Sequence, residues 1–304
     1  MKKRSLISLL LVSLLIALLV SGCTQQTPEA DKQPAEPQKT SIKIGGSSTL
    51  APIVAKCADN FTEEFKTWNK VDASLPEEPI VIFVSTGGSG FGLKSAQDGT
   101  FDIGLVSKSL KDDEKAPFAQ GEIVQIGSDV LDIAVNPQNP AAKVKPNLTS
   151  AELKDIFSGK ITSWKQLDPK LPDKEIVVAV RDIGGGASEV FDKAVMKGTP
   201  ISPKAQQIPS MGALAAKIMD NADVIGYVSS GLVNQNPDKL VPISVDGVAP
   251  TLDNIKSGRY IIGRPLLVLS KDKFDIREKL FVDYLSSEKG QAVVEEMGYI
   301  KAAK

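Results

Sequence analysis

The chain has 304 residues, of which 24% are charged and 42% hydrophobic, a composition typical of a globular protein. Its formal net charge of −1 argues against a nucleic acid as partner. The sequence contains no histidine, which excludes Ser-His-Asp and Cys-His catalysis and the histidine-based zinc sites.

The N-terminal residues 1–22 have the pattern of a secretory signal peptide. Three basic residues at positions 2–4 precede an almost unbroken apolar run over 6–20. The small residues before Cys23 resemble a bacterial lipobox, which implies that Cys23 carries a lipid anchor; the alternative is an ordinary signal peptide with a coincidental cysteine. Because removal of residues 1–22 takes away three positive charges and no negative charge, the net charge falls from −1 to −4. We expect an exported protein, lipid-anchored to the outer face of the cell membrane or periplasmic.

Residues 23–40 are predicted to be a lipid-anchored, disordered tether. The stretch 24–40 contains three prolines and no aromatic or large aliphatic residue, so it cannot bury apolar surface. The folded part begins near Ser41 with a predicted strand over 42–44. A loop of glycine and hydroxyl residues at 45–49 follows it.

A helix is predicted over residues 50–65. Its apolar stripe includes Cys57, which we interpret as a buried structural thiol. Pro52 lies in the first turn of this predicted helix, where a proline is tolerated.

A second loop of glycine and hydroxyl residues occupies positions 85–92, between a predicted buried strand over 80–84 and a helix that opens at Leu93. Glycine lets the backbone come close to a ligand. The helix behind it presents unpaired N–H groups and the positive end of its dipole. The stretch therefore predicts an anion site, against the alternative of a flexible turn.

The middle of the chain continues the alternation of strands and helices. Strands are predicted over 102–106 and 130–135, and a capping box of Thr149 and Glu152 begins a helix that ends at Gly159. Trp164 is interpreted as a core residue.

A third loop of the same kind follows a strand over 176–180 and carries an arginine, Arg181, at the strand's end. Its glycines at 184–186 precede a helix over 189–196. The remaining predicted elements are strands over 225–229 and 261–269 and helices over 277–286 and 290–297.

This alternation predicts an α/β fold with mainly parallel sheets, and about 265 folded residues predict two domains. In such sheets ligands bind at the carboxyl ends of strands, where all three loops stand. Three helix N-termini, the guanidinium of Arg181 and the hydroxyls of Ser48, Thr49 and Ser89 suit a small tetrahedral oxyanion. Arg181 could equally be a surface charge.

Six short motifs stand in a fixed order over residues 41–300. They are Gly46-Ser47-Ser48-Thr49-Leu50-Ala51-Pro52, Gly87-Gly88-Ser89-Gly90, Gly99-x-x-Asp102-Ile103-Gly104, Arg181-x-x-Gly184-x-Gly186, Ile225-Gly226-Tyr227-Val228-Ser229 and Arg264-Pro265-Leu266. Together they resemble the phosphate-binding proteins of ABC importers, which have the periplasmic-binding-protein fold.

The resemblance implies a two-lobed fold of type II with two hinge strands and an anion in the cleft. Lobe 1 would comprise 41–133 plus 262–304, and lobe 2 would comprise 134–261. It also implies a binding protein with no enzymatic activity and no cofactor, whose partners are phosphate or a similar oxyanion and an ABC permease. We expect a monomer. The implied ligand residues are Ser48, Thr49, Leu50, Ser89, Ser107, Arg181, Gly185, Gly186 and Ala187.

Three positions depart from the family pattern. Gly185 and Ala187 stand where serine and threonine are usual, which removes two hydroxyl donors. Ser107 stands where many members have an aspartate, which accepts a hydrogen bond from protonated phosphate and repels sulfate. Sulfate, molybdate and tungstate therefore remain alternative ligands, and a surface sensor or adhesion domain remains an alternative function. Asp102 is interpreted as bracing a loop and not as a ligand.

Overall fold

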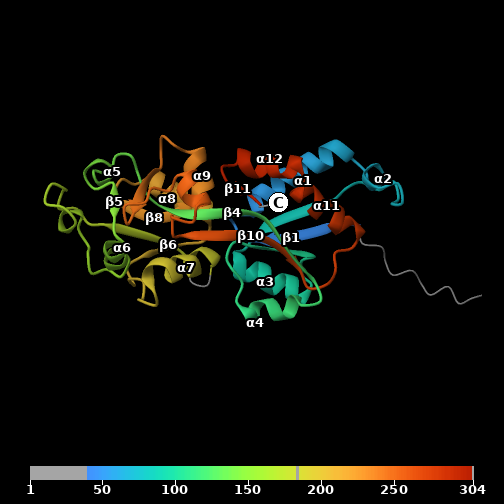
Figure 1. Cartoon of the computed structure of the whole chain (residues 1–304), viewed down its shortest axis with the longest axis horizontal. Coiled ribbons are helices and arrows are strands. Elements are labelled where there is room, and N and C mark those ends of the chain that lie inside the picture. The colour runs from blue at the N-terminus through green and yellow to red at the C-terminus, as the bar shows by residue number, and fades with distance from the viewer. Residues whose placement is uncertain (1–39, 183–184, 303–304) are drawn as a thin grey trace, which may run out of the picture. The chain divides into compact units, whose positions relative to one another are not determined.

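The computed structural model describes residues 40–182 and 185–302 (Figure 1). The predicted signal peptide, Cys23 and all of the predicted tether except Thr40 lie outside the described residues, as does Gly184 of the third loop. In the described part of the chain, no helix is both long and apolar enough to cross a membrane.

One trio of parallel strands is built from the first part of the chain. Strand β1 (Ile42–Gly46) lies between β2 (Ile82–Thr86) and β3 (Ile103–Val106). Helices α1 (Ala51–Phe65) and α12 (Glu288–Glu296) lie on one side of these strands, and α3 (Ser89–Asp98) and α4 (Asp112–Lys115) lie on the other (Figure 1).

A second parallel trio is built from the middle of the chain. Strand β6 (Val177–Arg181) lies between β8 (Val224–Ser229) and β7 (Gln206–Ile208). The flanking helices are α6 (Ser150–Phe157), α7 (Gly186–Phe191), α8 (Met211–Met219) and α9 (Ser230–Gln235); a π-helical turn over Asp192–Met196 continues α7.

Two antiparallel strands join the trios. The 14-residue β4 (Glu122–Val135) and β10 (Gly263–Ser270) complete the order β2-β1-β3-β10-β4-β8-β6-β7. Strand β10 pairs antiparallel with both β3 and β4, and β4 pairs antiparallel with β8. The predicted parallel pairing is present within each trio, and the pairing is antiparallel where β4 and β10 join the trios, because the chain crosses between the trios in opposite directions.

The other described elements are short or lie at the chain's end. They are α2 (Trp68–Val71), a 3-10 turn (Ala116–Phe118), α5 (Ala141–Val144), β5 (Asn147–Leu148), a 3-10 turn (Trp164–Gln166), β9 (Val241–Val245), α10 (Leu252–Lys256), α11 (Ile276–Ser286) and β11 (Ile300–Lys301).

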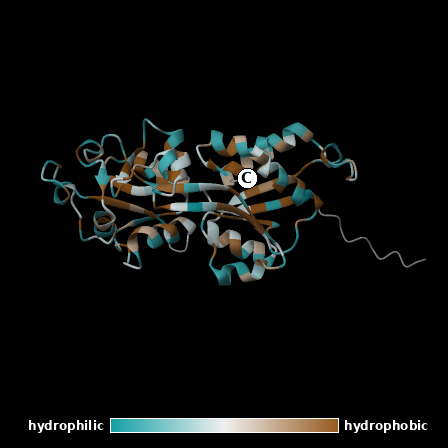
Figure 2. Ribbon diagram, viewed as in Figure 1, coloured by the Kyte–Doolittle hydropathy of each residue, from teal (hydrophilic) through white to brown (hydrophobic). Residues whose placement is uncertain are grey.

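Two large hydrophobic clusters form separate cores, which makes the fold two-lobed. One cluster draws its residues from 42–126 and 266–299, and the other from 130–262. We call the parts around them lobe 1 and lobe 2; the lobe boundaries given above stay a prediction. Figure 2 shows hydrophobic residues along the central strands. Trp164 is fully buried in lobe 2 and Cys57 is a buried free thiol in lobe 1, as predicted.

Several predicted elements differ from the structure near the glycine loops. Strand β2 is an edge strand whose Phe83 is 59% exposed, so the predicted buried strand is wrong. Helix α3 begins at Ser89, and α7 begins at Gly186, so both helices start inside the segments predicted as loops. The capping box of Thr149 and Glu152 is confirmed, since each side chain accepts from the other's backbone N–H at 3.1 and 2.8 Å.

Candidate anion-binding site

The first loop places two hydroxyls at the junction of the lobes. The Ser47 hydroxyl accepts from the backbone N–H groups of Thr49 and Leu50 at 3.2 Å each, which fixes the turn at the start of α1. The neighbouring Ser48 hydroxyl accepts from the Arg181 guanidinium at 2.8 Å and from the Met211 N–H at 3.2 Å, both in lobe 2. Ser48 therefore connects the two lobes directly.

Close packing around β1 explains one of the glycines in this loop. Gly46 has φ +137, a conformation that favours glycine. A Cβ there would also lie 2.4 Å from the Leu105 carbonyl oxygen and 2.7 Å from the Cα of Gly92 on α3. Helix α3 can thus approach β1 and β3 closely enough to bring its first turn beside the Ser48 loop.

The second loop contributes Ser89, the first residue of α3. Its hydroxyl is buried and accepts from the Ser107 N–H at 3.0 Å. The hydroxyls of Ser107 and Ser47 lie 2.5 Å apart. Ser107 therefore ties the ends of three lobe 1 elements together.

The third loop brings Arg181 into the junction from lobe 2. Its side chain is only 4% exposed and is held from behind by the carbonyl oxygens of Ile208 and Pro209, which accept at 2.9 and 2.8 Å. It also forms an ion pair with Asp182, whose side chain is 44% exposed. These partners hold the planar guanidinium so that its remaining donor reaches Ser48.

Helix α7 packs its first turn against the lobe 1 loops. A Cβ at Gly186 would lie 2.4 Å from the Ser89 hydroxyl and 3.0 Å from the Ser107 carbonyl oxygen. No side chain larger than hydrogen fits at this contact. Gly185 precedes it, and its N–H donates to the Asp182 carbonyl oxygen at 3.1 Å.

A second arginine, Arg264 on β10, belongs to the same site. Its side chain is 1% exposed and forms an ion pair with Asp129 on β4, which is fully buried. Two guanidinium nitrogens donate to one Asp129 oxygen at 2.9 and 2.6 Å, and one of them also donates to the Thr49 hydroxyl at 3.0 Å. The Asp129 carboxylate accepts further bonds from Ser229 and Ser230 of lobe 2.

A small cavity of about 10 Å³ lies where these groups meet. Its lining residues are Ser47, Ser48, Thr49, Gly88, Ser89, Arg181, Gly186, Ala187 and Arg264. Six predicted ligand residues are in this set, namely Ser48, Thr49, Ser89, Arg181, Gly186 and Ala187. Among the described residues, no carboxylate lines the cavity, because Asp129 and Asp182 lie behind the arginines with which they pair.

Three predicted ligand residues do not line the cavity. The Leu50 side chain is fully buried in the core of lobe 1 and its N–H donates to the Ser47 hydroxyl, Ser107 braces the Ser47 and Ser89 hydroxyls, and Gly185 is the residue before α7. The sequence reasoning missed Ser47, Gly88 and Arg264 as lining residues. An arginine inside a predicted strand gives no sign of the face it occupies, so its motif alone could not assign Arg264 to the site.

Asp102 lies outside the cavity, and its carboxylate accepts from the Lys43 N–H at 2.6 Å. This contact joins the segment before β3 to β1, so the interpretation of Asp102 as a brace is confirmed.

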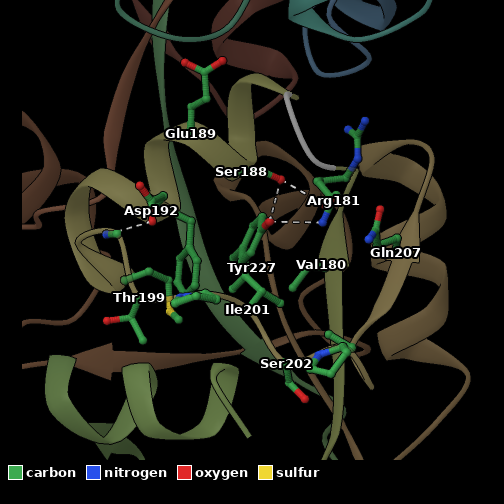
Figure 3. Close-up of a pocket in the computed structure, with 16 residues that line it drawn as sticks. Val180, Arg181, Ser188, Glu189, Asp192, Thr199, Ile201, Ser202, Gln207 and Tyr227 are labelled. Carbon is green, nitrogen blue, oxygen red and sulfur yellow. Dashed lines mark hydrogen bonds between the residues drawn. The ribbon is translucent and has the colours of Figure 1, made fainter.

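A larger cavity of about 550 Å³ lies in lobe 2, behind Arg181 (Figure 3). Figure 3 shows Tyr227 in its middle, with hydrogen bonds to Ser188 and Arg181. The Tyr227 hydroxyl accepts from the Arg181 N–H and pairs with the Ser188 hydroxyl, each at 3.1 Å. Burial raises the pKa of Tyr227 although these hydrogen bonds oppose the shift, so the hydroxyl stays protonated at neutral pH. Tyr227 thereby supports the backbone of the third loop.

Comparisons with known proteins agree with this geometry. The PBP superfamily domain matches residues 31–289. The phosphate-binding protein PstS of Staphylococcus epidermidis is 31% identical over 278 residues, which cover 88% of this chain and 80% of that protein. This chain belongs to the family of phosphate-binding proteins. PstS of Staphylococcus aureus strain USA300 is 30% identical over 276 residues, 87% of this chain and 79% of that protein.

Solved structures of the family share the fold. A putative phosphate ABC transporter substrate-binding protein from Clostridium perfringens, solved with bound phosphate, has 30% sequence identity and a TM-score of 0.74. The match covers 86% of this chain and all of that protein. An ABC-type phosphate transport receptor from Vibrio cholerae has 27% identity and a TM-score of 0.66 over 86% of this chain and all of that protein. The two-lobed fold expected from the motifs is thereby confirmed.

Proposed function

We propose that this phosphate-binding family member captures phosphate between its lobes and delivers it to an ABC permease without breaking a bond. The cavity carries the proposal, because it is lined by a buried arginine from each lobe, Arg181 and Arg264, and by serine and threonine hydroxyls of lobe 1. A relative with 30% identity was solved with bound phosphate, which supports the same ligand here.

The proposed ligand contacts follow from the donors around the cavity. Arg181 offers a planar fork from lobe 2, and the hydroxyls of Ser48 and Thr49 offer donors from lobe 1. The first turn of α7, at Gly186 and Ala187, adds backbone N–H groups and replaces the two hydroxyls that the family usually has there. The side chains of Arg181, Ser48 and Thr49 are each held by protein partners before an anion arrives, so little ordering of these side chains is required on binding.

Entry of the anion requires the lobes to move apart. The bond between Ser48 and Arg181 joins the lobes across the cavity, and an anion between them would take both donors. We propose a hinge motion about β4 and β10 that moves the predicted lobe 1, 41–133 plus 262–304, relative to lobe 2, 134–261.

The cellular context is part of the proposal. The predicted signal peptide and lipobox cysteine support an exported chain that Cys23 anchors to the outer face of the cell membrane. Such an anchor would keep the binding protein near the permease to which it delivers its ligand. We propose that it acts as a monomer.

Calorimetry tests the function by measuring the affinity of the mature chain and of Arg181→Ala for phosphate. Removal of a buried charge-assisted partner of a dianion should weaken binding by about hundredfold or more. Arg259→Ala, which removes an exposed arginine, is the matched control and should bind like the wild type. Unchanged affinity in Arg181→Ala would contradict the site assignment, and absence of phosphate binding by the wild type would contradict the function.

A further inference from the structure

An ion pair crosses between the lobes next to the candidate site. Lys108 directly follows Ser107 in lobe 1, and Glu189 lies two residues after Ala187 on α7 in lobe 2. The Lys108 Nζ atom donates to both Glu189 carboxylate oxygens, at 2.8 and 2.7 Å. The pair therefore fastens the segment after β3 to the helix whose first turn lines the cavity.

The burial of Lys108 distinguishes this contact from an ion pair on the protein surface. Its side chain is 3% exposed, whereas that of Glu189 is 33% exposed. Burial by itself would lower the pKa of Lys108, but the hydrogen bonds that it donates to the Glu114 and Glu189 carboxylates, together with their negative charges, outweigh burial and raise the pKa. Lys108 thus stays charged. Figure 3 shows the Glu189 carboxylate pointing away from Tyr227, although Glu189 is among the residues that line the lobe 2 cavity.

A second carboxylate makes the contact reversible. Glu114 on α4, in the same lobe as Lys108, accepts from its Nζ atom at 2.5 Å. When the lobes part, Lys108 keeps this partner and does not become an unpaired buried charge. Glu189 is already one third exposed and gains water. The open state therefore escapes the large penalty of an isolated buried charge.

We propose that the Lys108–Glu189 ion pair is a latch that holds the lobes closed and sets the rate at which the anion leaves. This inference rests on the proposed phosphate binding. The latch forms only when the lobes meet, so it acts after the anion has entered. Its loss should therefore raise the dissociation rate and leave the association rate nearly unchanged.

The size of the effect follows from the burial of the two partners. Breaking an exposed ion pair changes an equilibrium constant by a few-fold at most, whereas breaking a fully buried pair changes it by about hundredfold or more. Because Lys108 is buried and Glu189 is partly exposed, we expect Glu189→Gln to raise koff by about tenfold, between these limits. High salt should reduce this difference between the wild type and Glu189→Gln.

The test is stopped-flow measurement of phosphate kon and koff for the mature chain at two ionic strengths. Lys111→Gln is the matched control, because the Nζ atom of Lys111 lies 3.8 Å from Glu189 and its side chain is 68% exposed. It should leave koff unchanged. Thermal unfolding without phosphate checks that Glu189→Gln is folded like the wild type.

A double-mutant cycle distinguishes the loss of the Lys108–Glu189 ion pair from a change in koff that any substitution on α7 would cause. In a Lys108→Met background, Glu189→Gln should change koff by less than about twofold, since its partner is gone. The proposal is overturned if Glu189→Gln leaves koff unchanged, lowers kon instead, or acts equally in both backgrounds. A wild type that binds no phosphate overturns the proposed function itself and the latch with it, which distinguishes the two failures.

Discussion

Replacement of Arg264 by methionine should cause a large loss of stability, because it strands a buried charge. Asp129 is fully buried, and two Arg264 nitrogens hold one of its oxygens at 2.9 and 2.6 Å. Breaking a buried ion pair by removing one partner costs about 3–5 kcal/mol. For a chain of this size, each kcal/mol shifts Tm by about 2–4 °C, so we expect Tm to fall by about 10 °C.

Urea unfolding of Arg264→Met and of Arg264→Met/Asp129→Asn measures the effect. The double variant carries no stranded charge, so it should recover at least half of the lost free energy of unfolding. Lys279→Met is the control, since it removes an exposed ion pair with Asp283 and should leave the midpoint unchanged. If Arg264→Met unfolds at the wild-type midpoint, or the double variant is no more stable than the single one, the pair is not a stabilising charge pair.

Three further outcomes follow from the structure. Sulfate should compete with phosphate in the wild type, and Ser107→Asp, which puts a carboxylate next to Ser47, should disfavour sulfate by about tenfold relative to phosphate; equal competition in both proteins would refute this. Burial, reinforced by Asp129, raises the pKa of Asp132 well above its usual range. The free energy of unfolding of the wild type should therefore fall as pH rises above about 4, because ionisation of Asp132 is disfavoured in the folded state. The free energy of unfolding of Asp132→Asn should depend less on pH, and parallel pH profiles of the two proteins from pH 5 to 8 would contradict this prediction. Burial raises the pKa of the Cys57 thiol to about 12, so iodoacetamide at pH 8 should label it only after unfolding, and rapid labelling of the native protein would contradict this.

Local patterns in the chain predict the elements that local forces stabilise. The helix over Ala51–Phe65 and the capping box at Thr149 depend on residues a few positions apart, and both were predicted from sequence. The edge strand β2 was misjudged, because its β-branched and aromatic residues are compatible with either an edge or a central position. Strand β4 was predicted only over 130–135, since its first part is stabilised by pairing with β10 from the far end of the chain.

From sequence alone, the three glycine loops and Arg181 pointed to an oxyanion site at the carboxyl ends of strands, and the ordered motifs pointed to the family. These signals are local, because glycine, hydroxyl and helix N-terminus chemistry acts within a few residues. Tertiary structure decided which of these residues meet. It brought Arg264 into the cavity from β10, placed Leu50 in the core, and set Ser107 and Gly185 behind the lining. Such choices depend on the register and crossing of distant strands, which no short stretch of sequence encodes.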